Sequence, residues 1–341
     1  MKNKKWIALA AAVVLAVTAL PMTVFASKKD KEEEKLSKVT LNEVAHSVFY
    51  APQYVAIEEG YFTEEGLDLT LVTGFGADKT MTAVISGEAD IGFMGAEASV
   101  YAYQEGATDP VVNFAQLTQR AGNFLVAREE MPDFKWEDLK GKKVLGGRKG
   151  GMPEMVFEYI LKKNGIDPQK DLTIDQSIDF GSTAAAFTGD DSAAYTVEFE
   201  PSATILEKEG GGYVVASLGE ASGYVPYTSY SAKVSYMEEN PEIIQKFTNA
   251  LQKGMDYVQS HTPEEIAEVI APQFKETDIE TITTIVKRYY DQDTWKENLI
   301  FEKDSFELLQ DILEDAGELS QRVNYEALVQ TSSAEKASKD K

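Results

Sequence analysis

Acidic and aromatic side chains stand at the ends of several predicted strands in this chain of 341 residues. The acids are Glu97, Glu198 and Glu200. Carboxylates are costly to bury without a partner, so three of them at strand ends favour a ligand with an amine or another cationic group. Tyr50, Tyr195 and Tyr227 could stack on a planar molecule. Together these residue types predict binding of a small aromatic or amine-bearing compound.

Each candidate also has a structural interpretation, and both remain open at this point. Glu97 would be a favourable charge in the first turn of a helix, and Glu198 and Glu200 fit a generally acidic surface. Tyr50 could pack under the helix that follows it. His46, about one turn earlier in the chain, is either a hydrogen-bonding group for the ligand or a satisfied residue of the wall.

Glycine-rich turns before predicted helices support a different ligand, because backbone N–H groups at a helix start favour a negative group. The turn residues concerned are Phe75, Gly76, Gly95, Gly151 and Met152. Arg148 and Lys149 precede the last of these turns and could hold an anion or be solvated. Gln119 and Arg120 lie where the chain is expected to cross between two lobes. Arg120 could bind a ligand carboxylate or phosphate, or pair with one of the glutamates.

Composition argues against catalysis and metal binding. The chain has no cysteine and only two histidines, which excludes disulfides, thiolate metal sites and a cysteine nucleophile and disfavours a histidine-rich zinc site. Two carboxyl groups about 5–10 Å apart could serve a glycosidase, but no Ser-His-Asp pattern or metal motif accompanies them. We therefore expect no catalytic residues, no metal and no cofactor, and a binding protein rather than an enzyme.

The elements that must position these residues alternate between strand and helix. Such βα units are expected over 45–103 and again over about 122–222, which predicts an α/β fold with parallel strands whose carboxyl ends bind ligand. From residue 241 onward the pattern changes to long amphipathic helices. We predict a hinged clamp of two lobes: lobe 1 from 38–120 plus 225–328, with the C-terminal helical region packed on it, and lobe 2 from 121–224. A polar tail, 329–341, is expected to be disordered.

The N-terminus reads as a targeting segment. Three lysines precede an apolar run over 6–20, and small residues follow at 24–26, which is typical of a secretory signal peptide, 1–26. A membrane anchor is the alternative, but the run is short for a span of about 20 residues. A flexible charged spacer, 27–37, comes next, and no cysteine is present for a lipid anchor. We expect an exported, extracytoplasmic protein.

The net charge of the chain restricts the classes of partner that it can bind. Removal of 1–26 leaves 30 basic and 57 acidic residues, a formal charge of −27. Such a surface repels nucleic acid and anionic membranes, although solubility also explains much of it. We expect no nucleic-acid partner.

Four segments in order resemble one protein family: YAPQYVAIEEGYF at 50–62, GL at 66–67, SGEADIG at 86–92 and DLKGKKV at 138–144. They are similar to the ABC-transporter substrate-binding proteins of the nitrate, sulfonate, taurine and thiamine-pyrimidine group, over nearly all of 38–325. The resemblance implies a two-lobed periplasmic-binding-protein fold (Venus-flytrap, type II), ligand capture between the lobes, and delivery to a membrane permease with a cytoplasmic ATPase. It also places cleft residues after the strand that precedes Glu198 and Glu200.

Several functions stay open under this resemblance. A monomer that binds a thiamine-type aminopyrimidine is the leading hypothesis, and an oxyanion such as an alkyl sulfonate, taurine or nitrate is the alternative. The eukaryotic pyrimidine synthases share the fold and are enzymes, but the resemblance implies a cysteine-rich iron-binding motif for them, and this chain has no cysteine. A structural or sensory protein that binds no small molecule is the last possibility.

Overall fold

The computed structural model describes residues 35–178 and 181–339. The predicted signal peptide and residues 27–34 of the predicted spacer therefore lie outside the described residues. The first strand begins at Ser37, the last residue assigned to that spacer. Among the described residues, no helix is both long and apolar enough to cross a membrane.

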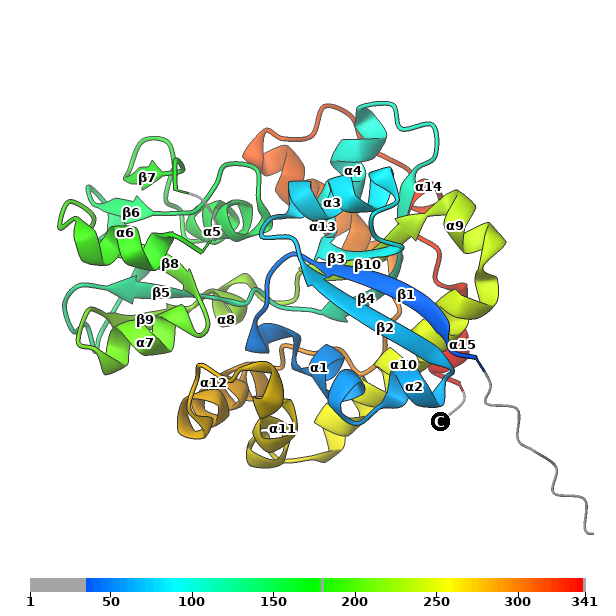
Figure 1. Ribbon diagram of the computed structural model, residues 1–341. Coiled ribbons are helices and arrows are strands. Elements are labelled where there is room, and N and C mark those ends of the chain that lie inside the picture. Colours follow the sequence, from blue (N-terminus) through cyan, green and yellow to red (C-terminus); the bar gives the residue numbers. More distant parts are fainter. Residues whose placement is uncertain (1–34, 179–180, 340–341) are drawn as a thin grey trace, which may run out of the picture. The chain divides into compact units, whose positions relative to one another are not determined.

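A five-stranded sheet with the strand order β2-β1-β3-β10-β4 forms the core of lobe 1 (Figure 1). Its strands are β1 (Ser37–Glu43), β2 (Leu67–Thr73), β3 (Ile91–Gly95), β4 (Val111–Thr118) and β10 (Thr228–Lys233). β1 pairs in parallel with β2 and β3, and β10 runs antiparallel to both β3 and β4. The helices of this first part are α1 (Ala51–Glu58), α2 (Tyr61–Glu64), α3 (Ala77–Ser86) and α4 (Glu97–Gln104).

A second five-stranded sheet, β7-β6-β8-β5-β9, forms the core of lobe 2. Its strands are β5 (Asn123–Ala127), β6 (Lys143–Leu145), β7 (Thr173–Asp175), β8 (Tyr195–Phe199) and β9 (Tyr213–Ser217), with helices α5 (Met152–Lys163), α6 (Thr183–Gly189), α7 (Ser202–Lys208) and α8 (Leu218–Ser222). β6 is parallel to β7 and β8, whereas β5 is antiparallel to β8 and β9. In each sheet, three parallel strands are followed by one antiparallel strand that enters from the other lobe. This strand is β10 in lobe 1 and β5 in lobe 2. This is the predicted two-lobed α/β fold; below, lobe 2 means 121–224 and lobe 1 the rest of the described chain.

Local sequence explains where the elements around the first sheet begin and end. Pro52 lies in the first turn of α1, where a missing N–H costs nothing. Gly60 and Gly87, at φ +76° and +80°, follow α1 and α3 in the left-handed conformation that favours glycine. These turns return the chain so that each new strand enters the sheet from the same end.

The C-terminal part is helical, as predicted. It contains α9 (Val234–Glu239), α10 (Pro241–Ser260), α11 (Pro263–Ile270), α12 (Ile279–Asp291), α13 (Lys303–Ala316), α14 (Tyr325–Leu328) and α15 (Ser332–Ala337). α10 buries an apolar stripe that includes Phe247, Leu251 and Met255 and packs on α1 and α2. Gly254 permits the close approach, because a Cβ there would overlap the carbonyl oxygen of Pro52. The predicted packing of the helical region on lobe 1 is therefore confirmed.

The expectation of a disordered tail over 329–341 is wrong for the described residues up to 339. Val329 forms an isolated parallel bridge with Asn113 beside β4. α15 then packs on α10 and buries Ser333, Ala334 and Ala337. Small residues fill this contact, so the polar composition of the segment gave no sign of it.

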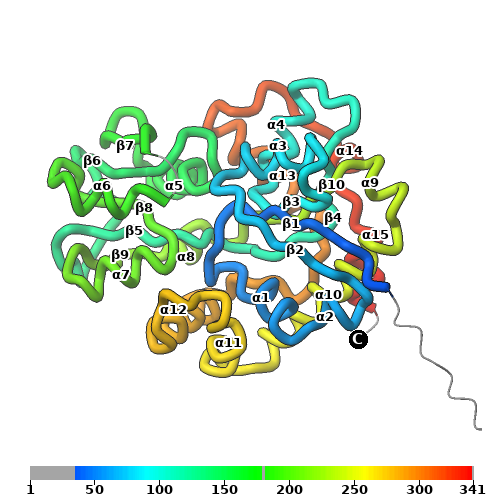
Figure 2. The backbone as a smooth tube through the Cα atoms, in the orientation of Figure 1, coloured from blue at the N-terminus to red at the C-terminus, as the bar shows by residue number. Residues whose placement is uncertain are grey.

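Two short segments, 119–122 and 223–227, carry the chain between the sheets and can be followed in Figure 2. They run side by side, because the Val225 N–H donates to the Gln119 carbonyl at 2.8 Å. α12 supports the first crossing: the Tyr289 hydroxyl donates to the Gly122 carbonyl at 2.9 Å and Gln292 Nε2 to that of Ala121 at 3.1 Å. The hinge is therefore tied to a helix of the C-terminal part.

Candidate functional site

An aromatic cluster joins the lobes beside the hinge. Phe49 is fully buried in the short 3₁₀ helix Val48–Tyr50. Its ring centroid lies 5.1 Å from that of Tyr50, 5.8 Å from Phe199 of lobe 2, 5.6 Å from Tyr227 and 5.1 Å from Tyr289. Residues of both lobes thus form one cluster of tilted and edge-on aromatic rings, a residue type suited to contact with a planar molecule.

Glu97 is the most unusual charged group at this convergence. It begins α4 directly after β3 and is only 3% exposed. Burial raises its pKa to about 7, although its own backbone N–H, that of Met152 in lobe 2 and the charge of Arg148 act in the opposite direction. Its Oε2 atom has no hydrogen-bond partner in the described part of the chain. A buried acceptor without a donor is costly in the empty protein and is a natural contact for a ligand N–H.

Asn123 supplies a complementary group. The Tyr227 hydroxyl donates to Asn123 Oδ1 at 2.6 Å. Asn123 Nδ2 is buried and has no acceptor among the described residues. The charge of Glu97 also acts on Tyr227, whose pKa is raised mainly by burial. Tyr227 is therefore hydrogen-bonded to Asn123 and feels the charge of Glu97. One buried unpaired acceptor and one buried unpaired donor in this region suit a ligand that carries both an N–H donor and an acceptor.

Glu198, in contrast, is satisfied within lobe 2. Its Oε2 accepts from Thr183 Oγ1 at 3.0 Å and its Oε1 from Thr196 Oγ1 at 2.5 Å. Burial raises its pKa to about 7, and the two threonine hydroxyls lower it. Both oxygens have donors, so Glu198 resembles Glu97 in burial but not in hydrogen bonding.

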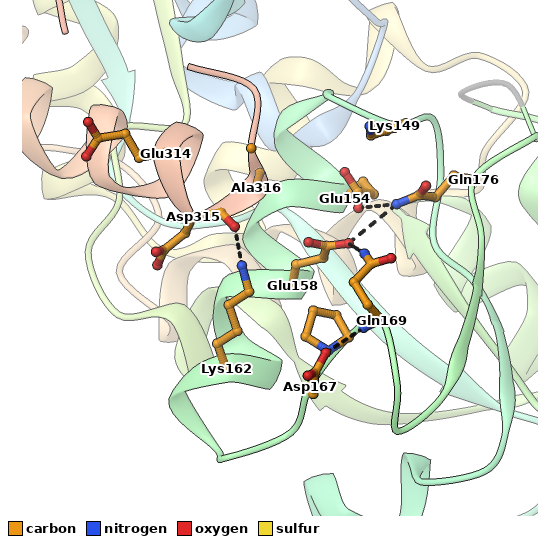
Figure 3. A pocket seen from close by; sticks show the side chains of 12 residues that line it. Lys149, Glu154, Glu158, Lys162, Asp167, Gln169, Gln176, Glu314, Asp315 and Ala316 are labelled. Atoms are coloured by element: carbon orange, nitrogen blue, oxygen red, sulfur yellow. Dashed lines mark hydrogen bonds between the residues drawn. The ribbon is translucent and has the colours of Figure 1, made fainter. Parts of the chain in front are cut away.

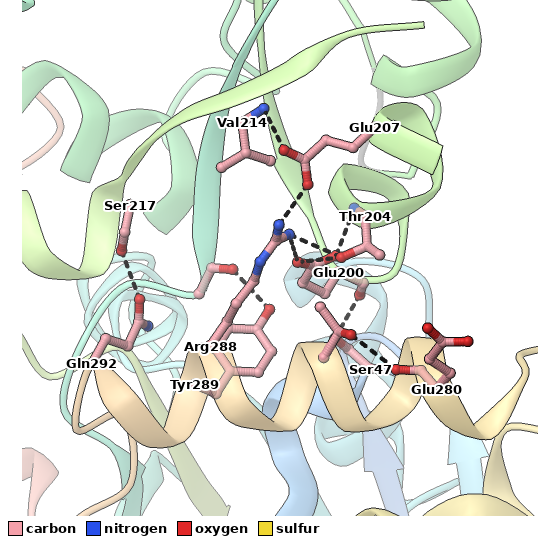
Figure 4. A network of polar contacts seen from close by, with 12 residues as sticks. Ser47, Glu200, Thr204, Glu207, Val214, Ser217, Glu280, Arg288, Tyr289 and Gln292 are labelled. Carbon is pink, nitrogen blue, oxygen red and sulfur yellow. Dashed lines mark hydrogen bonds and ion pairs between the residues drawn. The ribbon is translucent and has the colours of Figure 1, made fainter. Parts of the chain in front are cut away.

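Glu200 is occupied by an ion pair between the lobes (Figure 4). Its buried carboxylate accepts from Arg288 Nη1 of α12 at 2.8 Å and from the N–H and Oγ1 of Thr204, each at 2.9 Å. Arg288 also pairs with Glu207 of α7, and the Glu200 carbonyl accepts from Ser47 Oγ at 3.0 Å. These contacts give Glu200 a structural part and leave it no free acceptor for a ligand.

The predicted crossing residues serve the hinge. The Arg120 guanidinium lies 4.3 Å above the Tyr224 ring and donates through Nη1 to the Gly219 carbonyl at 3.1 Å. Its buried Nε has no acceptor in the part of the chain that the structure describes. Gln119 Nε2 donates to the Asp293 carbonyl at 3.2 Å. Tyr195 begins β8, at the opposite end of the strand from Glu198, and donates to Met131 Sδ at 3.3 Å. The structure therefore does not bring Tyr195 together with Glu97 and Tyr50.

His46 belongs to a hydrogen-bond network inside lobe 1. Its Nδ1 lies 2.8 Å from Glu43 Oε1 and its Nε2 2.9 Å from the Gln273 carbonyl oxygen. Both neighbours are acceptors, so the doubly protonated imidazolium satisfies both, and the hydrogen bond to Glu43 raises the pKa of His46. Glu43 is fully buried and also accepts from Gln53 and Tyr54, each at 2.8 Å. This geometry supports the interpretation of His46 as a satisfied wall residue.

Charged side chains lie beside the predicted glycine-rich turns. Phe75 has φ +57° and is 69% exposed, and Gly76 precedes α3. Asp78, in the first turn of α3, pairs with Arg148 Nη1 of lobe 2 at 3.1 Å. A carboxylate thus already occupies the helix start that could have favoured an anion. Gly151 caps α5, and Met152 behind it is buried.

Two cavities lie away from Glu97. One of about 470 Å³ is lined by α5 and the end of α13 and includes Glu154, Glu158 and Gln176 (Figure 3). The other, of about 350 Å³, lies between β9 and α12 and includes Arg288. No group of three or more histidine or acidic side chains within the described ranges is arranged to hold a metal ion.

Comparison with known proteins assigns the chain to a family. The model of the NMT1/THI5-like family matches residues 48–266. The chain belongs to this family. The "Putative binding protein YtlA" of Bacillus subtilis (strain 168) is 45% identical over 337 residues, 99% of each chain. A 4-amino-5-hydroxymethyl-2-methylpyrimidine phosphate synthase of Aspergillus parasiticus is 25% identical over 224 residues, which cover 62% of this chain and 63% of that enzyme.

A solved structure confirms the fold of this NMT1/THI5-like protein. The alkanesulfonate-binding protein SsuA of Xanthomonas axonopodis pv. citri, bound to MOPS, superposes with a TM-score of 0.70 at 15% identity. The match covers 87% of this chain and 99% of SsuA. At this identity the likeness establishes the fold and says nothing of the ligand.

Three important residues of this family member were absent from the sequence prediction: Asn123, Arg288 and Phe199. Arg288 stands in an amphipathic helix 88 positions from its partner Glu200, so no local pattern marks it. Asn123 and Phe199 are neighbours across β5 and β8, and their places at strand ends beside the crossing were the one available signal.

Proposed function

We propose that this protein is the extracytoplasmic solute-binding component of an ABC importer and that its ligand is a small amine-bearing aromatic molecule, with a thiamine-type aminopyrimidine as the leading candidate. The observation that carries the ligand assignment is Glu97, a buried carboxylate whose Oε2 has no donor within 35–178 and 181–339. An aminopyrimidine presents an amino N–H beside a ring nitrogen. The N–H would donate to Glu97 Oε2, and the ring nitrogen would accept from Asn123 Nδ2.

Aromatic packing and similarity support this choice. Phe49, Tyr50 and Tyr227 are buried around the same convergence and offer ring faces and edges to a planar heterocycle. The relative from Aspergillus parasiticus is named for an aminopyrimidine phosphate. The Bacillus relative, at 45% identity, bears the name of a binding protein, which agrees with a carrier. The absence of cysteine removes thiolate chemistry and favours binding without turnover.

The transport part of the proposal adds a route and partners. The chain would be exported by its N-terminal segment, bind its ligand as a monomer between the lobes, and deliver it to a membrane permease driven by a cytoplasmic ATPase. Closure around a ligand at the hinge is the property that lets such a carrier present loaded and empty states differently.

The test is a thermal-shift and calorimetric panel on the purified protein. The panel holds 4-amino-5-hydroxymethyl-2-methylpyrimidine, taurine, an alkanesulfonate and nitrate. A ligand at 100 times its Kd should stabilise the protein by about 2.7 kcal/mol. We expect this with the aminopyrimidine; stabilisation by the anions alone would overturn the ligand assignment.

A matched pair of variants distinguishes a direct contact with the ligand from the general effect of removing a buried carboxylate. Glu97→Gln should weaken binding by about tenfold to a hundredfold, because it removes the charged acceptor for the ligand N–H. Glu198→Gln removes a carboxylate of similar burial and pKa, about 7, whose oxygens are already hydrogen-bonded, and should leave affinity unchanged. Equal losses in the two variants would contradict the assignment of Glu97 as the ligand acceptor.

A further inference from the structure

Three consecutive residues of lobe 2 contact three different elements of lobe 1. Arg148 Nη1 lies 3.1 Å from Asp78 Oδ1 at the start of α3. Lys149 Nζ lies 3.2 Å from Glu318 Oε1, just beyond α13. The Gly150 carbonyl accepts from the Tyr101 hydroxyl of α4 at 3.0 Å. Residues 148–150, here called the 148–150 loop, are thus the point where lobe 2 meets the α3–α4–α13 side of lobe 1.

The loop leads directly into the candidate site. It is followed by Gly151 and by α5, whose Met152 N–H reaches the Glu97 carboxylate. Beneath the loop, the Gly150 N–H donates to Glu154 Oε2 at 3.3 Å, and Gln176 Nε2 donates to Glu154 Oε1 at 2.6 Å (Figure 3). Because Gly150 is hydrogen-bonded to Glu154 of α5, we expect the start of α5 to follow the loop when the loop moves. Release of the loop from lobe 1 would therefore also withdraw Met152 from Glu97.

The opposite side of the interface is built differently. The side chains of Arg288 and Glu200 are 26% and 0% exposed, whereas those of Arg148 and Asp78 are 47% and 55% exposed. Exposed ion pairs contribute little and separate readily, but separation of a buried pair leaves an uncompensated charge. Arg288 also belongs to α12, which is hydrogen-bonded to the hinge through Tyr289. The 148–150 side is therefore held by the weaker ion pair, and the α12 side by the stronger one.

We propose that the 148–150 loop is the closure latch of the ligand site and that Arg148 and Lys149 are positioning residues for ligand capture. They hold the start of α5 against α3, α4 and the end of α13, so that the Glu97 carboxylate is enclosed and aligned by Met152. The latch itself is a property of the empty protein. Its effect on affinity rests on the proposed function.

The first arm of the test needs no ligand. Because the chain contains no cysteine, exposed Lys79 of α3 and Ala185 of α6 can be replaced by cysteine and spin-labelled, and the distance between the lobes measured by double electron–electron resonance. The double variant Arg148→Ala/Lys149→Ala should increase the population with long distances. Lys253→Ala, which removes ion pairs between α10 and Glu64 and Glu65 within lobe 1, is the matched control and should leave the distribution unchanged.

The second arm measures affinity for 4-amino-5-hydroxymethyl-2-methylpyrimidine by calorimetry. Loss of two exposed ion pairs corresponds to a weakening of between about twofold and thirtyfold, and Arg148→Lys with Lys149 intact should restore near wild-type binding. Unchanged distances and affinity in the double variant would overturn the latch. If the wild-type protein does not bind this probe, the ligand assignment fails, and the distance arm alone still decides the latch.

Discussion

Replacement of Glu97 by glutamine should make the empty protein more stable while it weakens ligand binding. The pKa of Glu97 rises from 4.5 to about 7 on folding, chiefly through burial. Because one pKa unit corresponds to about 1.4 kcal/mol, the ionised carboxylate destabilises the folded state by about 3 kcal/mol. Glutamine removes this charge but buries an amide N–H₂ group, so we expect a net gain of about 1–2 kcal/mol at pH 8.

The same difference in the pKa of Glu97 between the folded and unfolded states sets how stability changes with pH. Below pH 4.5 the folded and unfolded states both hold the proton, and Glu97 has no effect on stability. Between pH 4.5 and about 7 only the unfolded state loses it, so stability falls as pH rises. Above about pH 7 the loss is complete and constant. The advantage of Glu97→Gln over the wild type should therefore grow from pH 4.5 to pH 8.

The assay is urea unfolding of the wild type and Glu97→Gln at pH 4.5, 6 and 8, with aminopyrimidine affinity measured in parallel at pH 8. Loss of a hydrogen bond to a charged group should weaken binding by about tenfold to a hundredfold. A variant that is less stable than the wild type at pH 8, or whose stability difference does not change with pH, would refute the reasoning. Glu97 would then be solvated or paired in the empty protein.

Three further substitutions test the frame around this site. His46→Gln should lower the free energy of unfolding, measured in urea, by about 1 kcal/mol at pH 5.5 and by less at pH 9. The pKa of His46 is raised in the folded protein, so its stabilisation is complete below pH 6.5 and is lost as the pH rises through the folded-state pKa. Equal losses of stability at the two pH values would contradict the ion pair with Glu43. Gly254→Ala should destabilise by about 1–3 kcal/mol in the same assay, since its Cβ would overlap the Pro52 carbonyl, whereas a gain would show that α10 can move away from α1. Arg288→Ala should cost roughly 3 kcal/mol by leaving buried Glu200 unpaired, and a loss below about 1 kcal/mol measured by denaturant would show that water compensates this charge.

Much of the fold could be predicted because the sequence has strong local periodicity. The βα units expected over 45–103 include β2, Leu67–Thr73, and the long helices expected from residue 241 onward begin with α10, Pro241–Ser260. Glycines and prolines at the turns set these limits. Short elements such as α2 and α15 were missed, because four to six residues carry too little periodicity and their conformation depends on packing against α10.

The candidate site was harder to predict, because hydrogen-bond partners decide which acids are available. Glu97, Glu198 and Glu200 have the same side chain and all are buried. Only Glu97 keeps an unpaired oxygen, since Glu198 takes two threonine hydroxyls and Glu200 takes Arg288. Those donors come from positions up to 88 residues away. Sequence pattern places an acid at a strand end, but it does not reveal whether a distant segment has already neutralised it.

The strand order of the two sheets also limits the order in which the two lobes can complete their sheets during synthesis of the chain. All five strands of lobe 2 come from one continuous stretch, Asn123 to Ser217. In lobe 1, β10 lies between β3 and β4, so those strands have no common neighbour until residues 228–233 arrive. Closing a sheet across more than a hundred intervening residues is slow. We therefore expect lobe 2 to form while lobe 1 still exposes unpaired strand edges, with β10 inserted late and the C-terminal helices docking after it.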